Sequence, residues 1–548
     1  MEVAASAAHT PKHERDPVEL VILGALAVLS VWMVGLLVKR TLVNGEGWTG
    51  ADGLHPSDQL QYMNWIRDAG RHVLISDLYE LRPSAASFLH PGFLLSGALT
   101  AVGVAPWLAY LVWKPVAVVG LFLAVRAYAY RIVPSRSGRR AALILALFFV
   151  PTAAFITAVA GQSPNFYLLG IEVEMWPGTW LWGYSFTVLA VAAIPAALLL
   201  YERDRGRRRI GAAAPLLGML CSWFQPWQGA TLLGTLVVTE LLMVRLHRAS
   251  RGRLEPGRGR SSQIPLLAIN VAAATAPLAY YALLARIDPS WALAKRVNTF
   301  GAWPLWTLLA SVAPLALPAA LAYRVAPATF QEVAVRAWPL IALGVYWLIA
   351  YAHIGTFPIH SFQGMTIPLA ILAVTGVGAH VRSWGPASRA VAVCVIGALI
   401  VPALVWKLND ARNSINVNAA VFPGAPPNVY FLPRSEADAL RYVTDDPRPG
   451  GVLTPLYLGQ LIPEATGRRT WVGALSWTPG FLLRLSRVER LFTGELTPVQ
   501  AITFVRSTGA RYLIIDCDHH GDLTTQLRPI IDGTRQFGCA RVLHVTGV

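Results

Sequence analysis

The feature that most constrains this chain is a series of long, predominantly apolar runs. The first covers residues 18–38, and a helix of twenty-one residues is long enough to cross the ~30 Å hydrocarbon core of a bilayer at ~1.5 Å per residue. Eight further runs follow at 108–130, 141–160, 178–201, 261–284, 303–323, 337–352, 364–380 and 389–407. Such runs predict a polytopic α-helical membrane protein.

One longer segment, 211–246, is apolar for 36 residues and has arginine-rich flanks on both sides. Because positively charged connectors belong on the cytoplasmic side, both ends of this segment are expected on one side of the membrane. The turn of the resulting hairpin is expected near Trp223 to Gly229, where Pro226 removes a backbone donor and breaks the helix. The segment therefore counts as two passes, which makes about eleven in total.

The charged residues indicate a membrane partner. The formal net charge is +16, yet only 14% of the 548 residues are charged and 55% are hydrophobic. A soluble chain of this length needs more polar surface. The arginines gather in short connectors between apolar runs, at 131–140, 202–209 and 245–260. That placement is typical of cytoplasmic loops that face anionic lipid headgroups, and it argues against nucleic acid as a partner.

Segment 88–105 is apolar but must not cross the membrane if the three arginine-rich connectors are to share one side. We therefore expect it to lie as a helix at the outer interface. The first apolar run is expected to be a retained helix, because Lys39 and Arg40 follow it where a cleaved signal peptide would have small residues. The chain is thus predicted to be a multi-pass protein of the cell membrane.

This topology divides the chain into three parts. The predicted parts are a cytoplasmic N-terminus at 1–17, a transmembrane module at 18–407 with an outer loop at 39–107, and an extracytoplasmic domain at 408–548. The last part reads as alternating helices and strands, which predicts an α/β layer. Its expected elements are a helix at 435–443 capped by Ser435, strands at 451–455 and 470–473, a helix at 498–508 and a buried strand at 511–516.

Two of the four cysteines, Cys517 and Cys539, fall in this terminal domain. They are either a disulfide, if the domain lies outside, or two free buried thiols, and we favour the thiols. The other two, Cys221 and Cys394, lie in apolar helices, where a thiol behaves as a small hydrophobic group. The Asp516–Asp522 run lacks the Cys and His spacing of a zinc site and reads as a turn-rich loop.

The most informative polar stretch of the outer loop begins at Asp58. Leu60, Met63 and Ile66 follow at three-residue spacing, with Tyr62 on an adjacent face, which predicts an amphipathic helix on the membrane surface. Asp58 stands at its start, where a carboxylate is able to cap free backbone amides. Capping and catalysis are the two interpretations of this residue.

An acid soon after the first transmembrane helix, then Tyr62, then His90 before an interfacial helix resembles the GT-C superfamily. These are multi-pass glycosyltransferases, among them bacterial mannosyltransferase-like members, that use polyprenyl-phosphate-linked sugars. The resemblance implies that Asp58 is a general base for an acceptor hydroxyl on a glycan, glycolipid or protein, with Tyr62 and His90 near substrate. Many relatives carry a second acid after the first, and Gln59 departs from that pattern. Whether a divalent metal ion is a cofactor therefore stays open.

The superfamily usually places another acid in the next outer loop, and here residues 161–177 supply Glu172 and Glu174. An extended segment would put both side chains on one face. The resemblance then implies that either glutamate assists catalysis by holding the acceptor or a metal ion. The alternative is an ordinary solvated loop.

A phosphate leaving group requires cations, and sugar hydroxyls require hydrogen-bonding groups. The residues expected in these roles are Lys114, Arg468 and Arg469 for phosphate and Gln228, His360 and Gln363 for phosphate or hydroxyls. Each also has a plainer interpretation. Lys114 is able to snorkel to the interface, the arginines to be solvated, and the others to be interfacial polar groups.

Three functions fit these observations. The leading prediction is a membrane glycosyltransferase with a lipid-linked donor, which explains an enzyme embedded in the bilayer. A transporter or lipid flippase would need charged residues deep in several helices and repeats of broken helices. A catalytically inactive relative that serves as a scaffold is the third, because Gln59 replaces the second acid.

Overall fold

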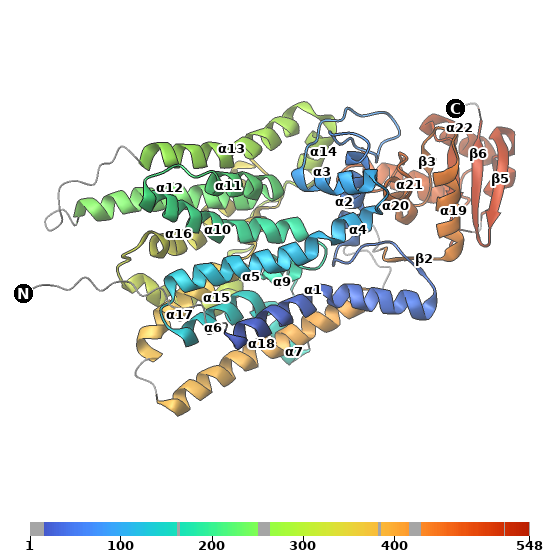
Figure 1. Ribbon diagram of the computed structural model, residues 1–548. Coiled ribbons are helices and arrows are strands. Elements are labelled where there is room, and N and C mark those ends of the chain that lie inside the picture. Colours follow the sequence, from blue (N-terminus) through green and yellow to red (C-terminus); the bar gives the residue numbers. More distant parts are fainter. Residues whose placement is uncertain are drawn as a thin grey trace, which may run out of the picture.

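The computed structural model shows a long helical bundle that carries a small α/β domain at one end (Figure 1). The first described residue, Asp16, pairs with Arg140 at the start of α6 (Arg136–Phe148). The structure describes residues 16–161, 165–249, 263–381, 385–415, 429–519 and 521–546.

All the apolar runs form helices. Eight helical segments of the described chain are long and apolar enough to cross a bilayer. They are α1 (Pro17–Asn44), α4 with α5 (Pro106–Leu111 and Trp113–Ile132), α10 (Ser185–Arg207), α12 (Pro226–Ala249), α13 (Gln263–Ile287), α15 (Leu305–Ala320) with η2 (Leu321–Arg324), α16 (Phe330–Ala352) and α18 (Pro386–Ser414).

Three further runs depart from straight spans. The pair α6 (Arg136–Phe148) and α7 (Thr152–Ala160) is bent by 79° where Pro151 interrupts the chain. The other two are short, α11 (Ala213–Phe224) and α17 (Thr366–Val381). The break between α11 and α12 falls at Gln225, directly before Pro226, so the predicted hairpin turn is correct.

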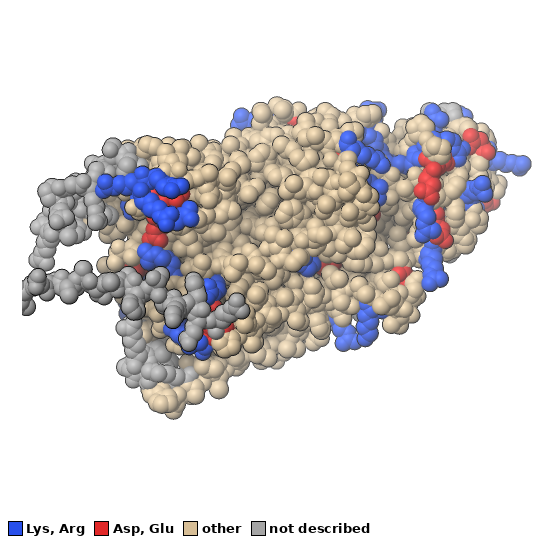
Figure 2. All heavy atoms as spheres, viewed as in Figure 1, with Lys and Arg blue, Asp and Glu red and all other residues tan. Residues whose placement is uncertain are grey.

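The arginine-rich connectors meet at one end of the bundle. Asp16 pairs with Arg140 at 2.7 Å, and Arg131 pairs with Glu202 at 2.8 Å across the first two connectors. Residues 250–260 of the third connector lie outside the described residues. Figure 2 shows the charged side chains gathered toward the two ends of the molecule, with a broad belt between them made mostly of uncharged residues. This belt is what a bilayer would cover.

The outer loop lies at the other end and joins the terminal domain. It holds β1 (Gly47–Trp48), α2 (Pro56–Ala69) and α3 (Pro91–Ala101). Strand β1 pairs antiparallel with β2 (Phe431–Leu432), which lies just beyond the last apolar run. With eleven residues, α3 is ~16 Å long, too short to cross a ~30 Å core, in keeping with the prediction for segment 88–105.

The terminal domain is a four-stranded sheet in the order β3 (Val452–Leu453), β4 (Tyr512–Ile515), β6 (Ala540–Val545), β5 (Ile531–Phe537). Strands β3 and β4 are parallel, and the other pairs are antiparallel. Its helices are α19 (Arg434–Asp445), α20 (Leu456–Thr466), α21 (Phe481–Phe492), α22 (Pro498–Thr508), α23 (Leu523–Gln526) and η4 (Arg528–Ile530). The remaining short helices of the chain are α8 (Phe166–Met175), α9 (Pro177–Trp180), α14 (Pro289–Val297) and η3 (Pro358–Phe362).

Two predictions about this domain are wrong and one open question is answered. Helix α19 is preceded by Pro433 in extended backbone, so Ser435 is inside the helix and not its cap. Segment 470–473 forms only a bridge from Thr470 to Val452, because the chain turns away after one pairing. Cys517 and Cys539, which we favoured as free thiols, form a disulfide that links the loop after β4 to the start of β6.

Candidate active site

Helix α2 presents Asp58 to solvent at the junction between the bundle and the terminal domain. Pro56 starts the helix with its fixed φ, and His55 precedes it as N-cap without a side-chain hydrogen bond to the helix. Asp58 is exposed, whereas Gln59 and Leu60 beside it are buried. The carboxylate is therefore not used as a capping acceptor, which removes one of the two interpretations of this residue.

Tyr184 is the partner of this carboxylate. Its hydroxyl donates to Asp58 Oδ2 at 2.9 Å, the only side-chain hydrogen bond that the described residues give to the Asp58 carboxylate. The ring of Tyr62 lies 6.0 Å from that of Tyr184, edge to face. Burial and the charge of Asp58 raise the pKa of both phenols, so both stay protonated at neutral pH. Asp58 thus stands beside two phenols that remain hydrogen-bond donors.

The predicted apolar stripe of α2 exists, but its partner is not lipid. Leu60 and Met63 pack with Leu458 and Leu461 of α20 in the terminal domain. Ile66 belongs to a second cluster, with aromatic residues of the outer loop and bundle. The helix is therefore buried between two parts of the protein and does not lie on the membrane surface, because the terminal domain covers the face expected to meet lipid.

Gln59 orders the loop that precedes Asp58. Its amide oxygen accepts from the backbone nitrogens of Asp52 and Gly53, and its amide nitrogen donates to Asp52 Oδ1 at 2.8 Å. A carboxylate at position 59 would face the carboxylate of Asp52 and repel it. The neutral glutamine is therefore suited to this place, and no second acid follows Asp58.

Lys114, expected near phosphate, is engaged inside the protein. Its Nζ lies 2.6 Å from Asp52 Oδ2 and donates to the carbonyl of Leu181 at 2.6 Å. The side chains of Lys114 and Asp52 are 6% and 1% exposed. This ion pair joins the outer loop to helix α5, which explains how a lysine is accommodated in an apolar helix. A phosphate-binding role for Lys114 stays a prediction.

Glu172 and Glu174 lie on a helix, α8, so they do not share a face as the extended interpretation required. Glu172 is fully buried, with its Oε1 2.9 Å from Lys407 Nζ and its Oε2 accepting from the backbone nitrogen of Ala154. Glu174 instead reaches His360, whose Nδ1 lies 2.7 Å from Glu174 Oε1. Two residues apart in sequence, the glutamates belong to different ion pairs.

His360 is the centre of a second polar group. Gln228 donates to the backbone carbonyl of His360 at 2.8 Å, and buried Gln363 follows in the same turn. Neither amide atom of Gln363 has a partner among the described residues. The ring of Trp180 lies 6.2 Å from His360 and 5.1 Å from Tyr184. The indole ring of Trp180 therefore lies between the His360 group and the Asp58 group, next to a ring of each.

The predicted phosphate-binding arginines are used to hold backbone. Arg468 donates to the carbonyls of four terminal-domain residues, Val443, Asp446, Arg448 and Gly450. Arg469 donates to the carbonyls of Asp77 and Arg82 and thereby fastens the terminal domain to the outer loop. Their guanidinium groups are committed to structure at both positions.

His90 is the N-cap of α3, and its Nδ1 accepts from the backbone nitrogen of Phe93 at 3.2 Å. The imidazole is buried against Phe93, Phe186 and Phe224. Burial lowers the pKa of His90 to about 3, so the ring is neutral. The structure thus gives His90 a capping role, and substrate contact stays a prediction.

A divalent metal ion has no complete protein site in the described part of the chain, where no three or more His, Cys, Asp or Glu side chains group around one point. The Glu174–His360 pair supplies two ligands only. A divalent metal ion as cofactor stays a prediction.

Sequence reasoning missed three residues that the structure places in these groups, Asp52, Tyr184 and Lys407. Asp52 lies in the outer loop before the stretch that begins at Asp58 and was not singled out. Tyr184 stood within a run taken as a simple span. Lys407 carried a usable signal, because a lysine at the end of an apolar run needs a buried partner or an interface.

Comparison with known proteins identifies the fold. The apo oligosaccharyltransferase of Archaeoglobus fulgidus aligns with 92% of this chain and 70% of its own, at 14% identity and a TM-score of 0.51. ArnT of Cupriavidus metallidurans aligns with 96% of this chain and 97% of its own, at 12% identity and a TM-score of 0.45. Both are GT-C membrane glycosyltransferases.

No protein-family model and no curated protein sequence matches this chain. The likeness is therefore one of fold, and the predicted fold class, a polytopic helical module of GT-C type with a terminal α/β domain, is confirmed.

Proposed function

We propose, from the GT-C fold, that this protein transfers a sugar from a polyprenyl-phosphate donor to an acceptor hydroxyl at the end of the bundle that carries the terminal domain. The observation that carries the proposal is Asp58. It is an exposed carboxylate on an otherwise buried helix, hydrogen-bonded by Tyr184, at the junction of bundle, outer loop and terminal domain. A base in that position contacts the aqueous phase on one side and faces a donor embedded in the lipid on the other.

The reaction needs one proton acceptor and one leaving group. The acceptor oxygen attacks the anomeric carbon, its bond to that carbon forms, and the bond from carbon to the phosphate oxygen breaks. Asp58 takes the hydroxyl proton, and the polyprenyl phosphate leaves with the bonding electrons. Tyr184 holds the carboxylate in place through Oδ2, since its raised pKa keeps the phenol a donor. A positioned general base contributes roughly 10²–10⁴-fold to such a step.

The His360 group suits the donor side of this reaction. His360 is partly exposed, oriented by Glu174, and flanked by the rings of Trp180 and Trp227. With Nδ1 held by the Glu174 carboxylate, the doubly protonated ring donates from Nε2 to a phosphate oxygen, and indole rings present apolar faces to a sugar. Glu174 and Gln228 then act through His360 by fixing its orientation.

The test is transfer of a radiolabelled sugar from a polyprenyl-phosphate donor to the glycolipid fraction, using membranes that contain the full chain. We expect Asp58→Asn to lower the rate by about 10²-fold or more at wild-type expression. The matched control is Asp532→Asn, an exposed aspartate on strand β5, which is expected to keep the rate. Equal rates for Asp58→Asn and wild type would refute the general-base assignment.

A further inference from the structure

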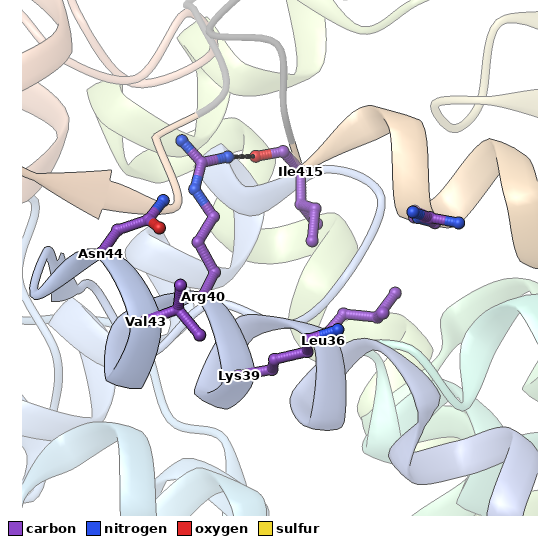
Figure 3. Close-up of a pocket in the computed structure, with 7 residues that line it drawn as sticks. Leu36, Lys39, Arg40, Val43, Asn44 and Ile415 are labelled. Atoms are coloured by element: carbon purple, nitrogen blue, oxygen red, sulfur yellow. Dashed lines mark hydrogen bonds between the residues drawn. The ribbon is translucent and has the colours of Figure 1, made fainter.

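A cavity of about 440 Å³ lies between the ends of α1 and α18 that face the terminal domain. Its lining is Leu36, Lys39, Arg40, Val43, Asn44, Arg412 and Ile415. Three of these seven residues are cations and none is an acid. Figure 3 shows the α1 side chains directed along this space, with the Arg40 guanidinium turned toward the carbonyl of Ile415, to which it donates at 2.6 Å.

Along the helices, the cavity lies at the level where lipid headgroups are expected. In α1 the apolar residues from Leu20 to Val38 span ~28 Å, about one hydrocarbon core, and Lys39 follows directly. In α18 the apolar run ends at Trp406, and Arg412 lies less than two turns beyond. Both helices therefore bring cations to the level where the hydrocarbon ends and lipid phosphates begin.

Below the cations the two helices make an apolar track. On α18, Val405 and Val401 lie seven and eleven residues before Arg412, on the same face, and both are exposed. On α1, Leu36 lies beneath Lys39 on one face. The two helices are joined at Trp32, whose indole nitrogen donates to the carbonyl of Leu408 at 3.2 Å. An acyl chain running from the cavity into the core would follow this track.

The cations differ in their exposure. Arg40 pairs with Glu46 at 3.0 Å and lies over the ring of Phe431, next to the β1–β2 pairing that starts the outer loop. Lys39 and Arg412 are exposed. The cavity lining holds three cations and no acid, and guanidinium and ammonium groups are the side chains that bind phosphate.

We infer that this cavity binds the phosphate of an anionic phospholipid of the leaflet on the terminal-domain side, with one acyl chain along the α1–α18 track. The bound lipid would fasten the two helices that deliver the outer loop and the terminal domain. This site is separate from the Asp58 and His360 groups, so the inference does not depend on the proposed function.

The test is native mass spectrometry of the full-length protein in detergent with added phosphatidylglycerol. Wild type is expected to retain one phosphatidylglycerol, and Lys39→Gln with Arg412→Gln to weaken retention by about fivefold per cation removed. The matched control, Arg286→Gln with Arg296→Gln, removes two exposed cations at the same end that do not line the cavity, and should retain the lipid.

Three results would overturn the inference. They are equal retention by the Lys39 and Arg412 double variant and wild type, equal retention of zwitterionic phosphatidylcholine, and displacement of the lipid by millimolar inorganic phosphate alone. Should the double variant not stay monodisperse, Lys39→Gln by itself, at an exposed position, is expected to give the about fivefold loss. Retention by that single variant at the wild-type level would equally count against the site.

Discussion

Replacing Lys114 by methionine distinguishes a structural lysine from a phosphate ligand. In the wild type, Lys114 Nζ lies 2.6 Å from Asp52 Oδ2, so the change leaves the buried carboxylate of Asp52 without its ion-pair partner. It also removes the group that donates to the carbonyl of Leu181. Breaking a buried ion pair on one side costs about 3–5 kcal/mol. We therefore expect Lys114→Met to lower the free energy of unfolding by that amount.

The structure also predicts which second change repairs the first. Asp52→Asn removes the unpaired charge yet keeps Oδ1 as an acceptor for Gln59. The double variant is left with the unpaired carbonyl of Leu181, a cost of about 1–3 kcal/mol. It should therefore be more stable than Lys114→Met alone, which gives a favourable coupling energy of a few kcal/mol in a double-mutant cycle.

The assay is equilibrium unfolding in mixed micelles by titration with dodecyl sulfate, followed by tryptophan fluorescence, with Lys295→Met as control for loss of a lysine at the same end. If Lys114→Met unfolds like wild type but no longer binds a polyprenyl-phosphate donor, the lysine is a phosphate ligand and the structural reasoning is refuted. An additive double variant would also refute it, because independent sites show no coupling.

Two other predictions concern the junction and the terminal domain. Burial raises the pKa of Asp77 from 3.8 to about 7, so the folded chain holds a proton that the unfolded chain releases between those values. The free energy of unfolding should then fall as pH rises from about 4 to 7, by up to about 1.4 kcal/mol per unit, and Asp77→Asn should flatten this slope in pH-dependent melting. A slope unchanged by the substitution would contradict it. Cys517→Ser with Cys539→Ser opens a loop closed across 22 residues and should destabilise the terminal domain by about 3 kcal/mol in denaturant titration, whereas an unchanged midpoint would contradict this.

The sites show where inference along the chain stops. The sequence indicated Asp58 as a candidate because a carboxylate at the start of an amphipathic pattern is recognised from neighbouring residues alone. Its hydrogen-bond partner, Tyr184, lies 126 residues away in the chain. Glu174 and His360 were found separately, and their pairing joins residues 186 positions apart. The face shared by Glu172 and Glu174 was mispredicted, because a short apolar segment does not reveal from its pattern whether it is strand or helix.

Local pattern was enough to predict the apolar helices of the bundle. Consecutive residues alone decide whether an apolar run is long enough to cross a bilayer. They also decide the arginine content of a connector. These features predicted the helices, the hairpin at Pro226 and the clustering of the described connectors at one end. The GT-C fold itself came from the resemblance of the outer loop and from the comparison with a solved structure.

Tertiary structure alone decided what each polar side chain does. Lys114, Arg468 and Arg469 looked alike in sequence as cations for a phosphate, yet the fold places a buried carboxylate or backbone carbonyls around each. Burial and partner determine whether a charge is paired or available, and both are set by contacts between distant segments. Asp58 is the acid that those contacts leave exposed beside two phenols at the junction.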